Sequence, residues 1–136
     1  MNLIAWIISA VIYLALGFIW YRIFEKTWLE EINKTKEDVK FTFSDYIGTV
    51  VTALLITFVE GVVIEFFHYA LVDIGQTMNA LFGLLIGLTV WVGFIGAVGM
   101  IQILYKNRSG TLFLIDYGYH LIGLIIGGLL MGGWFF

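Results

Sequence analysis

Five ionisable side chains interrupt the apolar stretches of this sequence: Glu60, Glu65, His68, Asp116 and His120. An ionisable group inside an apolar membrane helix is costly, which makes each of them a candidate functional residue by default. Buried carboxyl groups take up protons more readily than exposed ones, and imidazole titrates near neutrality. Proton transfer, or transport coupled to it, is therefore the first chemistry that these residue types suggest.

The depths of these groups along their helices form a series. At ~1.5 Å of rise per residue, and counted from helix starts at residues 111 and 46, Asp116, His120, Glu60, Glu65 and His68 lie at about 8, 14, 21, 28 and 33 Å in that order. The spacing predicts a ladder across a membrane rather than a cluster. Glu60 and His120 are the predicted titrating pair near its middle.

Other chemistries fit this ladder less well. Glu65 and His68 form an E-x-x-H pair, the spacing that di-iron helix bundles use. A metal cage would need further carboxylates at the same depth, and Asp116 is about 20 Å too low, so we expect no metal site. Haem ligation by two histidines fails on the same count. The serines lie away from both histidines, so no nucleophilic triad is expected. We therefore expect neither an enzyme nor a cofactor.

A structural interpretation of the same charges competes with the functional one. The two outermost groups would then reach the headgroups, and Asp116 would pair with Lys106 or Arg108 of the preceding loop. Glu60 and His120 would need one buried hydrogen bond between helices. A water-accessible cavity reaching Glu60 would favour transport, whereas a Glu60 sealed against His120 by packed glycines would favour a structural role.

The composition indicates that a bilayer surrounds the helices that carry these groups. Of 136 residues, 61% are hydrophobic and 12% are charged, and the mean hydropathy is +0.99. A soluble domain of this size could not bury that much apolar surface. The net charge of −3 comes without a basic stripe, so no nucleic-acid partner is expected. Cysteine is absent, which excludes disulfides and thiolate sites.

The apolar runs predict an all-α, polytopic membrane protein with four transmembrane helices in a bundle. A span needs about 20 apolar residues. We expect helices at about 2–24, 45–72, 77–105 and 111–135, within a single domain of residues 1–136. Period-2 alternation, which a membrane barrel needs, is not seen.

The basic residues predict the orientation of these helices. All seven fall in the two segments that connect the first span to the second and the third to the fourth: Arg22, Lys26, Lys34, Lys36, Lys40, Lys106 and Arg108. The positive-inside rule then predicts both termini outside, both basic loops in the cytoplasm, and a multipass protein of the inner (plasma) membrane. In the cytoplasmic segment 25–44, Trp28, Leu29 and Ile32 suggest a short amphipathic helix. A solvated linker with a capping Thr42 or Ser44 is the alternative.

Small residues predict how the helices pack. Gly83 with Gly87 and Gly123 with Gly127 are four residues apart, a spacing that lets two helix backbones approach closely. Gly128 with Gly132 repeats it. The sequence leaves open whether the partner helix belongs to the same chain. On the first span, one face is expected to turn toward the bundle, formed by Trp6, Ser9, Tyr13, Gly17 and Trp20.

Three segments resemble a known family: "LGFIWYRIFEKTW", "GLTVWVGFIGAVG" and "LFLIDYGYHLIGLIIGGLLMGGW". Their shared features are Trp20-Tyr21 followed by Trp28, the Trp91 to Phe94 stretch, and Ile115-Asp116 with Tyr119. Together they resemble the bacterial domain-of-unknown-function family 1761. The resemblance covers nearly the whole chain and implies a small multipass membrane protein, without a biochemical activity.

Two function classes follow from these observations. The first is an oligomeric transporter or channel for protons, a small cation or a small organic solute, with Glu60 and His120 as its titrating groups. A four-helix bundle is narrow, so a homo-oligomer is expected if it transports anything. The second is a non-transporting membrane scaffold or accessory subunit, held by its glycine faces and a structural buried polar pair.

Overall fold

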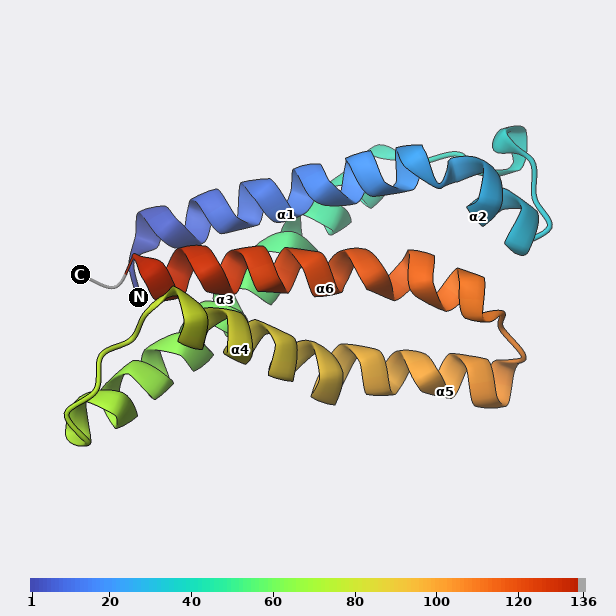
Figure 1. The fold of residues 1–136 in the computed structure, drawn as a ribbon. Helices are drawn as coiled ribbons and strands as arrows, with labels where there is room; N and C mark the ends of the chain where they lie inside the picture. Colours follow the sequence, from blue (N-terminus) through green and yellow to red (C-terminus); the bar gives the residue numbers. More distant parts are fainter. Residues whose placement is uncertain (135–136) are drawn as a thin grey trace.

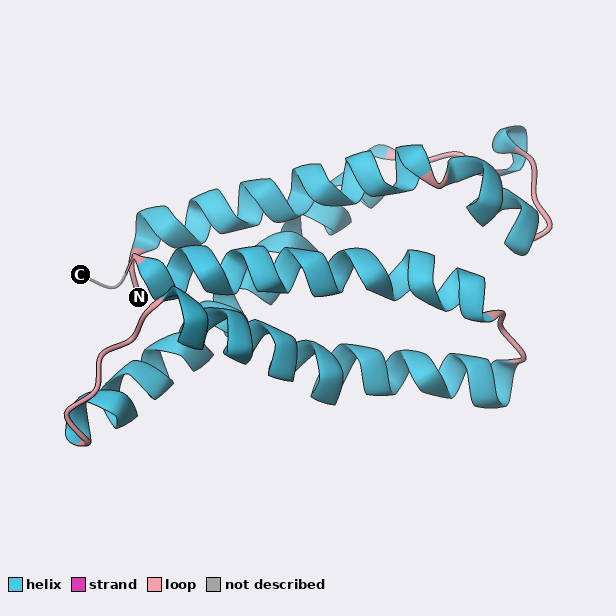
Figure 2. Ribbon diagram, viewed as in Figure 1, coloured by secondary structure: helices cyan, strands magenta, loops and turns pink. Residues whose placement is uncertain are grey.

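A computed structural model describes residues 1–134 of the chain, and these residues form helices and connections without a β-strand (Figures 1 and 2). The elements, in chain order, are α1 (Leu3–Ile23), α2 (Glu25–Glu31), η1 (Lys36–Asp38), α3 (Phe43–Asp73), α4 (Ala80–Val90), η2 (Trp91–Gly96), α5 (Ala97–Lys106) and α6 (Gly110–Gly133). Four helices are long and apolar enough to cross a membrane, with α4, η2 and α5 forming one of them. The predicted all-α class with four spans is confirmed, whereas the orientation in the membrane stays a prediction. Residue 135, the predicted end of the fourth span, lies outside the described residues.

The spans alternate in direction, so the connections gather at two ends. Figure 1 shows both termini and the connection 74–79 at one end, and α2 together with the connection 107–109 at the other. We call these the termini end and the loop end. The two basic segments of the sequence therefore lie at the same end of the molecule.

Polar residues set the helix starts. The side chains of Asn2, Asn79 and Ser109 accept hydrogen bonds from the first backbone amides of α1, α4 and α6. Thr42 and Asp45 form a reciprocal capping box at the start of α3. Of the two interpretations of segment 25–44, each is therefore correct in part, because α2 is a short helix and Thr42 caps the next span.

The closest helix contact joins α4 to α6. A methyl group built on Gly83 would overlap the carbonyl oxygen of Gly128, and one on Gly132 would lie 2.8 Å from the Cα of Gly83. The backbones therefore touch directly, which only glycine permits. The partner helix, left open by the sequence, belongs to the same chain.

The third span changes its helical geometry in the middle. Residues Trp91–Gly96 form a π-helical segment, in which the amide of Ala97 donates to the carbonyl of Val92, five residues earlier. The ring of Trp91 lies over Gly96, and its Nε1 donates to the carbonyl of Tyr117 at 2.9 Å. Beyond this segment α5 runs farther from α6 than α4 does (Figure 1).

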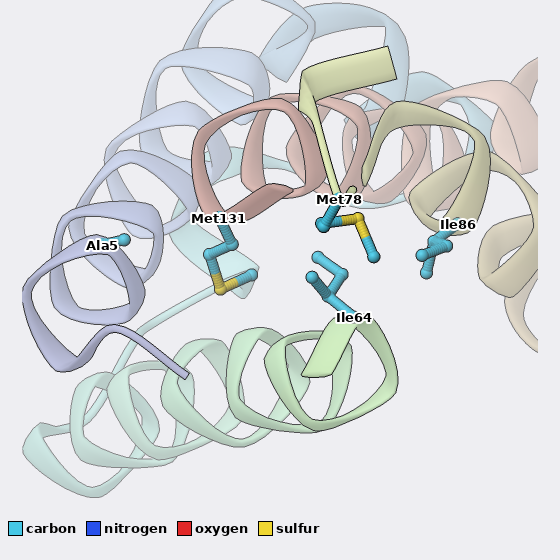
Figure 3. Close-up of a cluster of buried hydrophobic side chains, with 5 residues drawn as sticks. All are labelled: Ala5, Ile64, Met78, Ile86 and Met131. Atoms are coloured by element: carbon cyan, nitrogen blue, oxygen red, sulfur yellow. The ribbon is translucent and has the colours of Figure 1, made fainter. Parts of the chain in front are cut away.

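Two small apolar clusters complete the interior. Figure 3 shows the first near the termini end, where Met131 of α6 and Met78 of the 74–79 connection surround Ile64 of α3, with Ala5 and Ile86 beside them. The second joins Tyr13, Ala53 and Leu124. Most other large apolar side chains are exposed, as expected for helices that face lipid.

Candidate functional site

Glu60 lies in a closed cradle of glycines. Its side chain is 1% exposed, and neither carboxyl oxygen has a hydrogen-bond partner among the described residues. A Cβ atom added at Gly87 of α4 would lie 2.9 Å from one oxygen, and one added at Gly127 of α6 would lie 2.5 Å from the other. The carboxyl group of α3 therefore reaches the α4–α6 contact because glycines leave room for it there.

The termini-end side of this cradle is covered by apolar side chains. Gly61, the next residue of α3, faces the sulfur atoms of Met1 and Met131. Ile64, one turn further along α3, is fully buried. The two pockets described below, one beside Asp116 and one at the loop end, are not lined by Glu60. The carboxyl group is thus sealed from water in this conformation.

On the loop-end side, a column of polar groups continues along α1 and α6. Ser9 and Tyr13 of α1 are buried, and Tyr13 is close enough to Glu60 to interact with it electrostatically. The hydroxyl of Tyr13 is hydrogen-bonded to Nδ1 of His120. Its ring packs over Gly123, where a side chain would clash with it.

The predicted pair of Glu60 and His120 does not form a hydrogen bond. Gly127, which touches the carboxyl group of Glu60, follows His120 by seven residues on α6, or about 10 Å. Tyr13 occupies the space between them. The buried hydrogen bond that the structural interpretation required is therefore made by tyrosine and histidine, while the glutamate remains without one.

Asp116 ends the column toward the loops. Its Oδ1 accepts a hydrogen bond from the hydroxyl of Tyr21 at 2.8 Å and another from Nε1 of Trp28 at 3.0 Å. It forms no ion pair within residues 1–134, so the predicted pairing with Lys106 or Arg108 is wrong. The carboxylate instead ties α6 to both α1 and α2.

A small pocket leads to this carboxylate. Its volume is about 140 Å³, and it lies between α5 and α6, lined by Gln102, Arg108 and Asp116 among others. A water molecule takes about 30 Å³ in the liquid, so several fit. The divergence of α5 from α6 beyond the π-helical segment opens this space.

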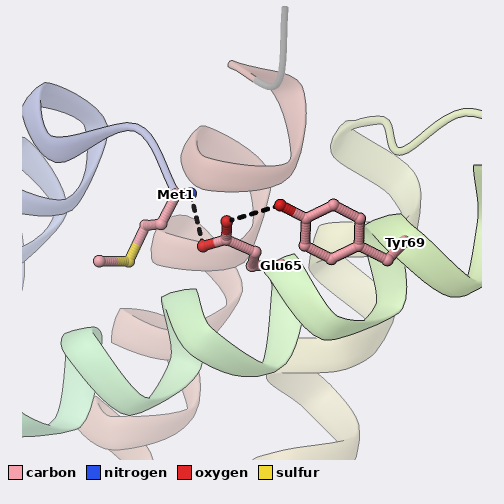
Figure 4. A network of polar contacts seen from close by, with 3 residues as sticks. All are labelled: Met1, Glu65 and Tyr69. Atoms are coloured by element: carbon pink, nitrogen blue, oxygen red, sulfur yellow. Dashed lines mark hydrogen bonds and ion pairs between the residues drawn. The ribbon is translucent and has the colours of Figure 1, made fainter.

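Glu65 and His68 lie nearer the termini end of α3. The carboxylate of Glu65 forms an ion pair with the amino group of Met1 and accepts a long hydrogen bond from Tyr69, drawn in Figure 4. His68 is partly buried and stacks edge-on against Tyr69, its ring centroid 5.6 Å away. No cluster of metal-ligating residues occurs in the described chain.

Several contributors to this site were not recognised as such in the sequence. Trp20 was expected on the bundle-facing side of the first span and Trp28 on a short amphipathic helix, but no contact with Asp116 was predicted for Tyr21 or Trp28. Trp20 donates to the carbonyl of Ile115 at 2.9 Å, and Tyr21 and Trp28 both donate to Asp116. Tyr21 also packs edge-on against Tyr119. The sequence did contain a signal for these contacts. The aromatic residues and Asp116 that carry the family resemblance meet around one turn of α6.

Four apolar helices joined by a polar column define a small polytopic membrane protein. A family model described as "Protein of unknown function (DUF1761)" matches residues 4–132, and the chain belongs to this family. No curated protein and no solved structure shows a significant match to the chain.

Proposed function

We propose that the protein moves protons across the membrane, with Glu60 as the group that takes up and releases them. The observation that carries this proposal is the buried carboxyl group of Glu60, which has no hydrogen-bond partner in the described chain. An unpaired carboxylate in such a site costs several kcal/mol, so we expect the side chain to hold a proton. A neutral structural role would be filled more cheaply by an apolar side chain.

The closed cradle favours protons over the larger candidates. A methyl group added at Gly87, Gly127 or Gly128 would lie 2.9, 2.5 or 3.3 Å from a carboxyl oxygen, so the cradle has less room than a hydrated cation or an organic solute needs. A proton needs only a chain of hydrogen-bonding groups. A small cation or a small organic solute would require α4 to separate from α6.

The polar column supplies one hydrogen-bonded link of such a chain, between Tyr13 and His120, and water or side-chain motion would have to bridge the steps to Asp116 and to Glu60. Water in the 140 Å³ pocket would reach the carboxylate of Asp116. Tyr119, whose ring stacks on His120 with centroids 3.9 Å apart, lies next in the column. His120 and Tyr13, already hydrogen-bonded to each other, would pass the proton toward Glu60.

The termini-end barrier has to open for net transfer. Met1 and Met131 cover α3 beside Glu60, and a flexible methionine side chain can move at low cost. The expected setting is the inner (plasma) membrane. The expected assembly is a homo-oligomer, since one four-helix chain is a narrow pathway. Native mass spectrometry of the detergent-extracted protein measures the number of copies.

A non-transporting scaffold or accessory subunit is the second candidate. The observation that favours it is the seal itself, because the side chain of Glu60 is only 1% exposed. In that case the glycine contact between α4 and α6 would hold the bundle together, and the uncharged side chain of Glu60 would only fill the space between the glycines.

Dissipation of a pH gradient in proteoliposomes tests the proposal. We expect the unsubstituted protein to dissipate the gradient faster than protein-free vesicles, and Glu60→Gln to abolish the effect, since an amide of the same shape cannot exchange the proton. Glu37→Gln, an exposed position of η1, is the matched control and should behave like the unsubstituted protein. Absence of flux from the folded, unsubstituted protein would contradict proton transfer and leave the scaffold.

A further inference from the structure

A pocket at the loop end, larger than the one beside Asp116, carries an excess of positive charge. Its volume is about 790 Å³, within the range of ligand sites. Three separate segments line it: α2 with the residues after it, the stretch before α3, and the α5–α6 connection. Its cationic residues are Lys34, Lys40, Lys106 and Arg108.

None of the four cations forms an ion pair with a carboxylate of the described chain. Within residues 1–134 the structure contains two ion pairs, and neither includes any of these side chains. All four are exposed. A cluster of like charges is unfavourable by itself, so a bound anion would stabilise it.

The two carboxylates of the pocket are hydrogen-bonded to other groups, and Asp38 also interacts electrostatically with Lys34. Glu31 accepts a hydrogen bond from the hydroxyl of Ser109. Asp38 accepts 2.8 Å hydrogen bonds from the amide and the hydroxyl of Thr35, which hold the pKa of its carboxyl below the usual range. With four cations against these two anions, the lining keeps a surplus of positive charge.

The fold adds to this field and supplies an apolar floor. α6 begins at Gly110 beside Ser109, so the positive end of a long helix dipole points toward the pocket. Trp28, Ile32 and the buried Leu112 line the same pocket. Cations above an apolar floor, at the edge of a membrane helix bundle, match a lipid whose phosphate lies at the headgroup level and whose chains continue into the bilayer.

We propose that this pocket binds the phosphate group of an anionic phospholipid from the leaflet at the loop end. Lys106 and Arg108 approach it from the α5–α6 connection, and Lys34 and Lys40 from the segment between α2 and α3. Such a lipid would join two connections that no ion pair links. The lipid would also lie beside Trp28, whose indole N–H donates a hydrogen bond to Asp116.

Native mass spectrometry of the detergent-solubilised full chain, titrated with phosphatidylglycerol, tests the assignment. We expect tighter binding of phosphatidylglycerol than of phosphatidylcholine. The double variant Lys106→Gln/Arg108→Gln should weaken it by about tenfold or more, given the contribution of each basic residue near an anionic surface. Arg22→Gln/Lys26→Gln removes the same charge from exposed positions outside the pocket and should leave the affinity unchanged.

A second variant keeps the test decisive if the first fails to fold. Lys34→Gln/Lys40→Gln removes the opposite side of the pocket and should give the same loss, with folding checked by circular dichroism. Equal affinity for the two lipids, or unchanged affinity in the folded pocket variants, would overturn the proposal. Displacement of the lipid by millimolar inorganic phosphate would also overturn it, because the pocket would then take a soluble phosphate.

Discussion

Asp116 is the residue that connects the most elements at the loop end. Its carboxylate lies on α6, and its donors come from the last turns of α1 and from α2. Hydrogen bonds to a charged acceptor are stronger than neutral ones. Trp20 reinforces the same junction by donating to the backbone of Ile115. The position of α2 against the bundle therefore depends on a few polar contacts rather than on an apolar face.

Removing this carboxylate should destabilise the junction measurably. We expect Asp116→Ala to lower the free energy of unfolding by about 1–2 kcal/mol, in line with buried hydrogen bonds in membrane proteins. Tyr21→Phe and Trp28→Phe should each cost less, since each removes one donor. Unfolding in mixed micelles with rising SDS measures all three.

The pairwise variants show whether the contacts act through Asp116. In an Asp116→Ala background, Tyr21→Phe should cost less than it does alone, because its acceptor is already gone. Purely additive effects would contradict the hydrogen bonds as the source of the stability.

Tyr13 is the second residue with a specific consequence, which rests on the proposed proton path. Tyr13→Phe keeps the ring over Gly123 and removes the hydroxyl that bonds His120. We expect proton flux in proteoliposomes to fall by about tenfold or more, with a stability loss of about 1 kcal/mol. Tyr105→Phe, at an 83% exposed position, is the control. Unchanged flux in Tyr13→Phe would remove tyrosine from the path.

For individual residues, the sequence identifies which side chains are unusual but not which groups they contact. Glu60 and Asp116 are evident as charges in apolar helices, since that pattern needs no coordinates. Their partners depend on how helices are rotated and shifted against one another, which a periodicity does not specify. Hence Tyr13, rather than Glu60, bonds His120, and two aromatic side chains, rather than a loop cation, bind Asp116.

Among the contacts between helices, the one between α4 and α6 leaves the least room for an added side-chain atom. Gly83→Ala places a methyl group on the carbonyl of Gly128, and backbone cannot move aside as a side chain can. We expect a loss of about 1–3 kcal/mol, typical of overpacking, measured by unfolding in SDS. Gly93→Ala, in the same span, meets nothing within 4 Å and is the matched control.

The control also defines what would contradict this account. Alanine favours helix by about 1 kcal/mol over glycine, so Gly93→Ala should be neutral or slightly stabilising. Equal destabilisation by both substitutions would mean that alanine disturbs the helix of this span at either position, and that the loss does not come from the contact with Gly128.

The boundaries and the interior of the third span differ in how well the sequence predicts them. Its ends follow from Asn79, which caps α4, and from the charges that begin at Lys106. The π-helical turn in its middle has no such signal. It arises where the indole of Trp91 reaches the carbonyl of Tyr117 and folds over Gly96, a set of contacts that only the assembled bundle creates.

For the whole molecule, the distribution of charge has a consequence for topology. Both basic connections lie at one end, and the termini lie at the other (Figure 1). Basic residues flanking spans are retained on the cytoplasmic side. The anionic pocket occupant proposed above would then come from the cytoplasmic leaflet, and Glu60 would lie nearer the outer surface than Asp116 does.

Cysteine labelling tests this orientation directly, since the sequence contains no cysteine. Thr27→Cys lies on the exposed side of α2 and Gln76→Cys in the exposed connection between α3 and α4. Neither substitution changes the charge that directs insertion. In intact spheroplasts, a membrane-impermeant maleimide should label Gln76→Cys, while Thr27→Cys should react only after the membrane is permeabilised. The reverse pattern would invert the topology, and labelling of both sites in intact spheroplasts would mean that the chain inserts in two orientations, so that its seven basic residues fail to select one.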